Sequence, residues 1–373
     1  MTDIIVYGAT GLTGRRVCAE LEAAGTSFAI AGRSAHKIAM LSREFPAAST
    51  RVMALDAMAF DDAKVVLNCA GPAGVTNEPV LAAALAAGAH YIDLGGEQAW
   101  LHTAYERHES TARKAGRVAL IGAGIDCVLG DWAAAWAAQY VCNQLDTDTE
   151  PTRTEPQPRL ADEKPFDEIT VSYVFDQFVL SPAGQQAAFA RLHEDSLVWK
   201  RDRWETIRPA SERRTINAGL DMGGEREVVS FPGGDVITIP RHIDAQKIQT
   251  FASTSRSRAT TTALRLIARA VPFLPKRATE ALGTYEPRAD EYAQTKFAII
   301  AQARRGFSSA QVTVRGSDMY TVSAIISAWI ARQLVARSTG PVGMRAPTEL
   351  FRAEPALREV AEAAGLVVEP SFA

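Results

Sequence analysis

The sequence predicts an α/β protein in which a doubly wound parallel sheet is joined to a second α+β domain built on a largely antiparallel sheet. Three observations lead to this prediction. Strand-like apolar runs alternate with helical patterns over the first third of the chain. A glycine-rich turn follows the first of these runs. Further strand-like runs, two of them separated by a hairpin signal, fill much of the second half.

The opening of the chain indicates a dinucleotide-binding turn. Ile4–Tyr7 is a short β-branched and aromatic run, typical of a buried parallel strand. Helical spacing follows, with Val17 and Leu21 four residues apart. Between the two lies Gly8-Ala9-Thr10-Gly11-Leu12-Thr13-Gly14, and this strand, turn and helix order is far more specific than glycines alone.

Each glycine of this G-x-x-G-x-x-G turn has its own physical task. Gly8 permits the tight turn, Gly11 lets the backbone approach a pyrophosphate, and Gly14 lets the helix pack closely against the strand. Free N–H groups at the helix N-terminus attract the phosphates. The cofactor-binding residues expected here are Gly8, Thr10, Gly11, Leu12, Thr13 and Gly14.

The end of the second predicted strand, Ser27–Ala31, indicates which dinucleotide binds. That strand runs into Gly32-Arg33-Ser34. An acidic residue at this place would bind the ribose hydroxyls of NAD, whereas Arg33 accommodates a 2′-phosphate and Ser34 adds a hydroxyl donor. The sequence therefore predicts NADP(H), with a solvated loop cation as the alternative for Arg33.

The alternation continues to six predicted strands, of which the last four are residues 51–55, 64–70, 90–94 and 117–121. Helices are predicted over residues 77–87 and 98–115, each closed by a glycine. Residues 56–63 are too few for a full helix, so this crossover is expected to be abbreviated.

The chain is expected to divide into three parts. Residues 1–130 form the NADP-binding domain, residues 131–315 a substrate and dimerisation domain, and residues 316–373 C-terminal helices that return to the first domain. Residues 146–167, rich in Thr, Pro, Glu and Asp, are expected to be a mobile linker. The second domain's predicted strands are 169–175, 227–231, 235–239, 247–251, 297–303 and 311–315, and helices are predicted at 260–274 and 319–336.

Composition excludes several classes of protein. A net charge of −3 argues against a nucleic-acid-binding surface. No apolar run reaches the roughly 18 uncharged residues of a membrane span, and the first strand begins too early for a signal peptide. The four cysteines lack C-x-x-C spacing and are expected to be reduced thiols without a metal. A cytoplasmic protein is expected, with a homodimer suggested by the antiparallel sheet and the apolar helix 260–274.

The first 130 residues resemble the saccharopine dehydrogenase family. The matching segments are the glycine turn, Ala31-Gly32-Arg33-Ser34, Asn68-Cys69-Ala70-Gly71-Pro72, Tyr91-Ile92-Asp93-Leu94-Gly95-Gly96-Glu97 and Gly124-Ile125-Asp126-Cys127-Val128-Leu129-Gly130-Asp131. The resemblance implies a Rossmann domain, an inserted α/β domain and NADP(H) chemistry. Family members reduce C=N bonds, as saccharopine and carboxynorspermidine dehydrogenases do, or C=C bonds, as trans-acting enoyl reductases do. Leu129 stands where members of the family commonly have proline, and residues 146–167 resemble an insertion relative to the family.

Ligands of open α/β sheets bind outside the carboxyl ends of the strands. Small residues after the fourth strand would allow close approach to the nicotinamide ribose, and Asn68 would hydrogen-bond it. Glu97 either binds substrate or merely opens the next helix, where an acid favours the helix dipole. The further cofactor-binding residues expected at these strand ends are Asp56, Asn68, Cys69, Ala70, Gly71, Pro72 and Asp93.

Three residues are candidate proton donors. His242 follows a predicted strand and titrates near neutral pH, with a structural role as its alternative. Tyr320 is the second candidate, or a helix-packing residue. Asp126 is the third, or a helix cap. Cys127 and Arg241 are expected to contact substrate, with Arg241 holding a carboxylate.

These residues predict an NADPH-dependent reductase that acts on the C=N bond of a small metabolite. One alternative is a trans-acting enoyl reductase that acts on a chain bound to a carrier protein. The other is a non-catalytic NADP-binding sensor or scaffold.

Overall fold

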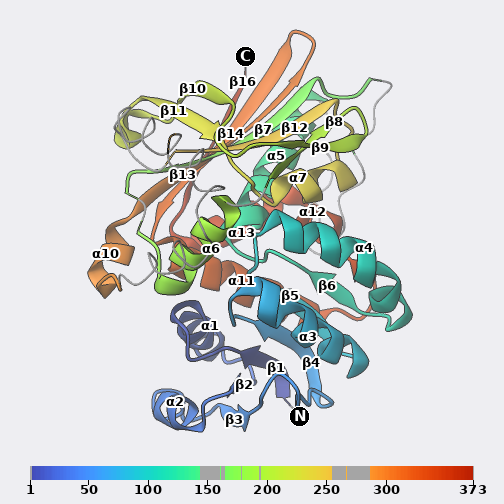
Figure 1. Cartoon of the computed structure of the whole chain (residues 1–373), viewed down its shortest axis with the longest axis vertical. Coiled ribbons are helices and arrows are strands. Elements are labelled where there is room, and N and C mark those ends of the chain that lie inside the picture. Colours follow the sequence, from blue (N-terminus) through green and yellow to red (C-terminus); the bar gives the residue numbers. More distant parts are fainter. Residues whose placement is uncertain are drawn as a thin grey trace. The chain divides into compact units, whose positions relative to one another are not determined.

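The computed structural model describes residues 2–142, 160, 164–177, 179–192, 195–253, 266 and 286–372. The chain forms two compact units (Figure 1). The first contains Met1–Ile125 and Tyr320–Ala346, and the second contains Asp126–Met319 and Pro347–Ala373.

The first unit is built on a seven-stranded parallel sheet in the order β15-β6-β5-β4-β1-β2-β3. Apart from β15, this is the strand order 3-2-1-4-5-6 of a Rossmann domain. The predicted parallel sheet is thus confirmed, with one additional strand. The strands are β1 (Thr2–Tyr7), β2 (Phe28–Gly32), β3 (Ser49–Val52), β4 (Ala63–Asn68), β5 (His90–Asp93), β6 (Val118–Leu120) and β15 (Gly343–Met344).

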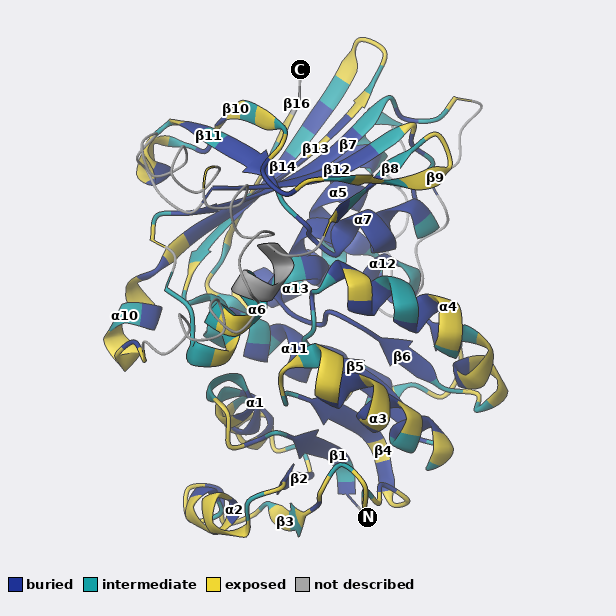
Figure 2. Cartoon of the chain, in the orientation of Figure 1, coloured by how far each residue is buried: buried dark blue, intermediate teal, exposed yellow. Residues whose placement is uncertain are grey.

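The strands are joined by α1 (Leu12–Ala23), α2 (Ala35–Leu41), α3 (Ala73–Ala86) and α4 (Gln98–Lys114). The β3–β4 connection contains no helix, as the short stretch after residue 55 predicts. Helix α3 begins four residues before the predicted start, directly after Pro72, and so carries Pro79 inside it. Figure 2 shows the strands of this sheet mostly buried, with β3 exposed, while α2, α3 and α4 each expose one face. This one-sided burial is what amphipathic crossover helices produce.

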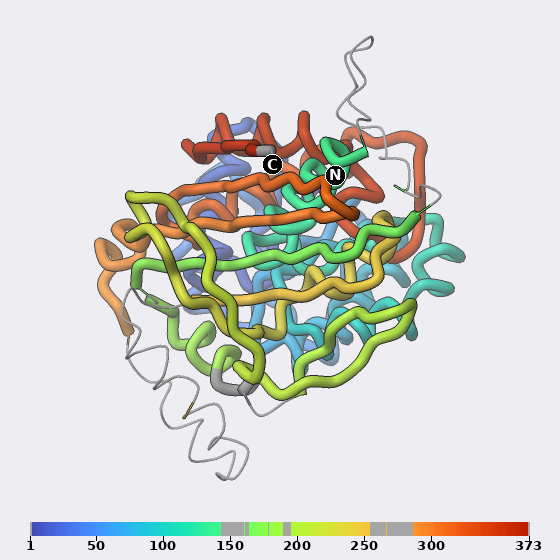
Figure 3. Tube along the Cα trace, turned by 90° about the horizontal axis from the view of Figure 1, so that it is seen from above, coloured from blue at the N-terminus to red at the C-terminus, as the bar shows by residue number. Residues whose placement is uncertain are grey.

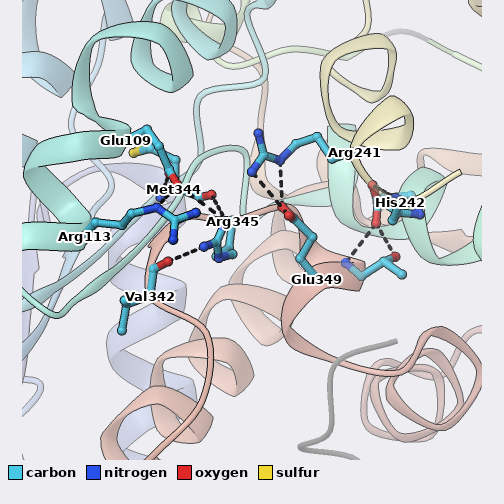
Figure 4. Close-up of polar contacts among 10 residues, drawn as sticks. Glu109, Arg113, Arg241, His242, Val342, Met344, Arg345 and Glu349 are labelled. Atoms are coloured by element: carbon cyan, nitrogen blue, oxygen red, sulfur yellow. Dashed lines mark hydrogen bonds and ion pairs between the residues drawn. The ribbon is translucent and has the colours of Figure 1, made fainter. Parts of the chain in front are cut away.

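Strand β15 was not predicted, because two residues carry no periodic signal. It lies beside β6, with Gly343 opposite Val118. The carboxylate of Glu109 on α4 accepts hydrogen bonds from the Met344 backbone N–H, at 2.6 Å, and from Arg113 Nε, at 2.7 Å (Figure 4). Tertiary contacts, and not local sequence, thus create the seventh strand.

The second unit contains a nine-stranded mixed sheet in the order β10-β11-β12-β7-β13-β14-β16, with β8 and β9 attached beside β12. Figure 3 shows β14, β13, β7 and β12 side by side. Every pairing except β12 with β7 is antiparallel, so the prediction of a largely antiparallel sheet is correct. The strands are β7 (Glu168–Phe175), β8 (Ser196–Lys200), β9 (Arg203–Ile207), β10 (Arg213–Asn217), β11 (Glu225–Ser230), β12 (Lys247–Ser253), β13 (Lys296–Arg305), β14 (Ser308–Ser317) and β16 (Val367–Phe372).

Two groups of buried side chains pack against this sheet. Helix α5 (Gly130–Val141) packs on β13 and β14 and buries both Trp132 and Trp136 completely. A second cluster, which includes Met222, Val228 and Phe251, lies under β10 and β11. Among the described residues of this unit, the other helices are α6 (Pro182–Leu192), α7 (Asp235–Thr238), α10 (Ala289–Gln294), α12 (Pro347–Leu350) and α13 (Ala353–Ala364), with short 3-10 turns at Leu220–Met222 and Ile239–Arg241.

The strand predicted at residues 235–239 is wrong: this segment is the helix α7 followed by the 3-10 turn Ile239–Arg241. Its β-branched residues favour a strand locally. All four residues of α7 are buried, however, so the segment lacks the alternation of buried and exposed residues that a half-buried strand shows. Packing against α5 and β12 decides the conformation.

The expected C-terminal part also divides differently. Residues Tyr320–Ala346 belong to the first unit, but Pro347–Ala373 belong to the second, because β16 pairs with β14. In the expected linker, Leu160 and Phe166 are buried and form isolated bridges to Ile243 and Ala245. The rest of 146–163 and, apart from Leu266, the helix predicted at 260–274 lie outside the described residues.

Helix α11 (Met319–Ala336) occupies its predicted place. By length and apolar composition alone, this helix would be sufficient to cross a membrane. Half of its residues are buried within the structure, and core helices meet the same criteria of length and composition.

Candidate functional site

The glycine turn after β1 leaves no room for side chains at two of its three glycines. Gly8 has a φ of +80°, and a Cβ there would lie 2.5 Å from the backbone nitrogen of Ala70. A Cβ on Gly14 would lie 2.4 Å from the Gly8 carbonyl oxygen and 2.8 Å from the Ala9 Cα. The turn is therefore pressed against the end of β4 on one side and against α1 on the other.

Gly11 lies in a different environment. A Cβ there would meet only the Gly8 carbonyl oxygen, at 3.4 Å, which is an ordinary contact. Gly11 is exposed and is the N-cap of α1, without a side-chain cap. Thr10 is also exposed, and Leu12 and Thr13 are half-buried. The N-terminal N–H groups of α1 thus border an open surface, which fits the pyrophosphate of a dinucleotide.

Arg33 follows β2 with an exposed side chain and makes no ion pair within the described part of the chain. Ser34 is the N-cap of α2, and its hydroxyl accepts a hydrogen bond from the Lys37 backbone N–H at 3.4 Å. Ser34 thus has a structural role that the sequence did not indicate. Asp56 lies exposed in the loop after β3.

A buried polar network joins the carboxyl ends of β4 and β5. Asn68 is 1% exposed, and its Nδ2 donates to Asn77 Oδ1 at 3.0 Å and to the Tyr91 hydroxyl at 3.2 Å. Its Oδ1 accepts from the Ala70 backbone N–H at 3.0 Å. The amide of Asn68 therefore shapes the strand-end loop, while its expected contact with the ribose stays a prediction.

Asp93 is the centre of this network and is completely buried. Its Oδ2 accepts hydrogen bonds from Asn77 Nδ2 at 2.9 Å, the Tyr91 hydroxyl at 3.0 Å and Trp100 Nε1 at 2.9 Å. Its Oδ1 accepts from the Gly95 and Gly122 backbone N–H groups at 2.9 and 3.3 Å. Burial raises the pKa of Asp93 to about 7, and the hydrogen bonds from Trp100, the two backbone groups and Tyr91 oppose that rise.

The remaining strand-end residues surround the same loop. Cys69 and Ala70 are half-buried, and Gly71 and Pro72, joined by a cis peptide bond, are exposed. Glu97 is half-buried at the N-cap position of α4 without a side-chain cap. The structure therefore places the residues predicted after β4 and β5 at the carboxyl ends of neighbouring parallel strands of the first sheet.

Asp126 and Cys127 lie in a π-helical turn, Ile125–Leu129, that precedes α5. Cys127 is fully buried and Asp126 is half-buried. The N-cap of α5 is Leu129, so the alternative role of Asp126 as its cap is wrong. The Tyr173 hydroxyl donates to the Asp126 carbonyl oxygen at 2.7 Å, which satisfies a backbone acceptor of the turn.

Arg241 is the last residue of the 3-10 turn Ile239–Arg241, and His242 follows that turn and not the predicted strand. Arg241 binds Glu349 through two nitrogens, at 2.7 and 3.2 Å (Figure 4). The His242 ring is 2% exposed and pairs through Nε2 with Asp131 Oδ2 at 2.8 Å. Both side chains therefore hold the second unit together, which favours the structural alternative given for His242. Tyr320, half-buried at the start of α11, keeps its place as a candidate donor.

Asp131 is itself fully buried and also accepts from the Thr348 backbone N–H at 3.0 Å and from its hydroxyl. Burial by itself raises the pKa of Asp131, but the charge of His242 and the hydrogen bonds from His242 and Thr348 outweigh it and lower that pKa. Asp131 thus joins α5 to His242, which follows the turn Ile239–Arg241, and to Thr348 of α12.

Sequence reasoning missed the partners of these carboxylates. Asn77, Tyr91 and Trp100 come from three elements, and only the two-residue spacing of Tyr91 and Asp93 on one strand signals a shared face. Asp131 and Thr348 lie 217 positions apart in the sequence. No local pattern indicates such a contact.

A polar hollow of about 350 Å³ lies on the sheet of the second unit, lined by residues of β7, β10, β13, β14 and β16. It contains none of the predicted site residues. Arg214 and Arg304 in its wall are already paired, with Glu168 and Asp167, and it is remote in sequence from the glycine turn.

Comparison with known proteins shows what the first unit is similar to. Residues 4–120 match the family model described as "Saccharopine dehydrogenase NADP binding domain". A saccharopine dehydrogenase-like oxidoreductase of Bos taurus is 31% identical over 152 residues, covering 34% of this chain and 35% of that protein. A trans-acting enoyl reductase of Mycobacterium tuberculosis is 31% identical over 141 residues, covering 35% of this chain and 34% of that protein. A lipid droplet localized protein of Caenorhabditis elegans is 30% identical over 146 residues, covering 35% and 34%.

These curated relatives are matched over about a third of their length. Among solved structures, the apo saccharopine dehydrogenase (L-Glu forming) of Saccharomyces cerevisiae is similar with a TM-score of 0.64 and 12% sequence identity, over 100% of both chains. That likeness shows a shared fold for the whole chain.

The glycine turn generates a first prediction. Gly14→Ala forces α1 away from β1, and we expect it to lower the free energy of unfolding by about 1–3 kcal/mol. Gly11→Ala keeps the stability of the parent protein, because its Cβ makes only an ordinary contact. It weakens NADPH binding about tenfold or more, because the Cβ occupies the path of the pyrophosphate. Thermal unfolding measures the change in stability, and calorimetric titration measures the change in NADPH affinity. Unchanged NADPH affinity of Gly11→Ala would refute the placement of the pyrophosphate at Gly11.

The Asp131–His242 pair generates a second prediction. A carboxyl whose pKa is lowered by folding stabilises the protein above about pH 4 and loses that contribution as pH falls. Asp131→Asn leaves His242 without its partner, so we expect a loss of about 3–5 kcal/mol at pH 7 and a flatter pH dependence below pH 5. Urea unfolding between pH 3 and 7 tests this. The exposed Asp61→Asn serves as control, with a change within about 0.5 kcal/mol; equal effects of the two substitutions would contradict the assignment.

Proposed function

We propose that the whole chain is an NADPH-dependent oxidoreductase that reduces the C=N bond of a small metabolite. The match of residues 4–120 to the saccharopine dehydrogenase NADP-binding domain model supports this proposal. One observation carries the proposal. The glycine turn after β1 and the exposed Arg33 after β2 lie at the carboxyl ends of neighbouring parallel strands. This is where a doubly wound sheet binds a dinucleotide and distinguishes its 2′-phosphate.

The residues present fit the cofactor. The open surface at Gly11 and the N-terminus of α1 would hold the pyrophosphate, and the guanidinium of Arg33 would bind the 2′-phosphate as a bidentate fork. When bound, NADPH supplies a hydride from the nicotinamide ring. The protein's own task is to orient the substrate, exclude water and supply one proton.

A protonated imine accepts hydride more readily, so an acid near the substrate nitrogen is the main requirement. We propose Asp126 and Tyr320 as the first candidates to test, because both side chains are half-buried. His242 ranks below them, since its ring is buried against Asp131. Glu97, Cys127 and Arg241 remain candidate substrate contacts, and for Arg241 this would require release from Glu349.

A trans-acting enoyl reductase is the second candidate. It is favoured by the similarity to mycobacterial proteins of that name. In this case the substrate would be a C=C bond of an acyl chain on a carrier protein, and the protein would polarise the thioester carbonyl and protonate the α-carbon. In both cases we expect a cytoplasmic homodimer. The third hypothesis is a scaffold protein that binds NADP without turnover.

The substrate proposal is tested by following NADPH oxidation at 340 nm with two panels. One contains cyclic imines and mixtures of amino acids with oxo acids, and the other contains enoyl thioesters of short and long chains. Turnover of imines alone supports the first candidate. Turnover of enoyl thioesters alone replaces it with the second, and tight NADPH binding without turnover on either panel favours the scaffold.

Arg33 generates a separate prediction about the cofactor. Arg33→Asp removes a charge-assisted contact and adds repulsion, so we expect NADPH affinity to fall about 10- to 100-fold while NADH affinity stays within about threefold. Calorimetric titration with both nucleotides measures this. Arg43→Asp, which changes another exposed arginine of the same unit, is the matched control and should leave both affinities unchanged. Equal NADPH affinity of Arg33→Asp and the parent protein would contradict the assignment of Arg33 to the 2′-phosphate.

A further inference from the structure

Asp93 joins one helix and two loops to a single carboxylate. Asn77 belongs to α3, which follows β4, and Gly95 belongs to the loop that follows β5. Gly122 belongs to the loop that follows β6, and in that loop the Ala123 N–H also donates to the Asp93 carbonyl oxygen at 2.6 Å. The segments that follow three consecutive parallel strands are therefore held together by a single residue.

These three segments all follow strands of the second half of the sheet. In a doubly wound sheet of this strand order, the half formed by β1 to β3 binds the adenosine part of a dinucleotide, and the half formed by β4 to β6 binds the nicotinamide part. The glycine turn and Arg33 belong to the first half. Asp93 and its donors belong entirely to the second half, so the two sets of residues serve different ends of the cofactor.

The Asp93 carboxylate is itself inaccessible. It is 0% exposed, and five donors surround its two oxygens. A direct hydrogen bond from Asp93 to a ligand would require the loss of one of these donors. Its influence on a bound cofactor therefore passes through the loops that it holds.

We propose that Asp93 is a positioning residue for the nicotinamide half of the cofactor, because it fixes the loops after β4, β5 and β6 before the cofactor arrives. The proposal rests on the NADPH-dependent function given above. It changes the role of Asp93 from the direct cofactor contact that the sequence predicts to an indirect one. Asn68 takes part in the same arrangement, since it bonds both Asn77 and the Ala70 N–H.

The chemistry of a carboxylate explains why asparagine cannot replace it. In its ionised form this carboxyl group offers only acceptors, and each of the five neighbours named above donates an N–H or O–H to it. Asparagine would turn an N–H₂ group toward one set of these donors and leave buried N–H groups unpaired. The loops would then separate or shift to find other partners, and the preformed surface for the nicotinamide would be lost.

The test compares two ligands on one variant. NADPH occupies both halves of the site, whereas adenosine 2′,5′-bisphosphate carries the 2′-phosphate and lacks the nicotinamide half. For Asp93→Asn we expect NADPH affinity to fall about tenfold or more, while the affinity for adenosine 2′,5′-bisphosphate changes by less than about twofold. A general loss of structure would weaken both ligands together, so this selectivity separates positioning from stability.

Two milder variants keep the proposal testable if Asp93→Asn does not fold. Trp100→Phe and Tyr91→Phe each remove one donor and keep the carboxylate, so we expect the same selectivity with about a threefold loss of NADPH affinity. Trp329→Phe is the matched control, because Trp329 is a buried tryptophan of the same unit outside this network. It should alter neither affinity.

The outcomes are distinct. Selective loss of NADPH affinity in Asp93→Asn or the milder variants supports positioning. Equal loss of both ligands, or no loss of either, overturns it. Failure of the parent protein to bind NADPH would overturn the proposed function itself, and that result comes from the parent titration alone.

Discussion

The close approach of α1 to β1 is the constraint on which the first unit depends. The Gly8 carbonyl oxygen lies where a Gly14 side chain would be, and Gly8 itself presses on the backbone after β4. Two glycines thus bring two strands and a helix terminus together without side chains between them. The N-terminal N–H groups of α1 consequently face the point where the strand order reverses, between β1 and β4. An anion-binding surface results from backbone geometry alone.

Both units bury carboxyl groups, and Asp93 of the first unit and Asp131 of the second are accommodated differently. Asp93 is surrounded by neutral donors, and burial raises its pKa to about 7. Asp131 meets the His242 ring and Thr348, which lower its pKa in spite of burial. The first arrangement joins α3 and the loops after β5 and β6, and the second joins α5, the turn before His242 and α12.

Much of the fold was predictable because its signals are local. Alternating apolar runs, a strand-turn-helix glycine pattern and glycine helix ends located β1 to β6 and the helices α1, α3 and α4, whereas α2 was not located. The hairpin of β13 and β14 was found from its turn residues. The failures share a different cause. Residues 235–239 are β-branched but lie in a helix because they are buried on all sides. The short strands β15 and β16 exist only because distant partners, β6 and β14, pair with them.

The sequence by itself determined the class of fold, the dinucleotide turn and the choice of NADP(H), because backbone conformation at glycines and the charge of Arg33 act over a few residues. Tertiary structure decided which candidate side chains are available for chemistry. Arg241 is paired with Glu349, 108 positions away, and His242 with Asp131, 111 positions away. Two of the five donors to Asp93, Asn77 and Gly122, lie 16 and 29 positions from it. The physical reason is that a buried polar group must find partners wherever the fold brings them, and local sequence does not record those partners.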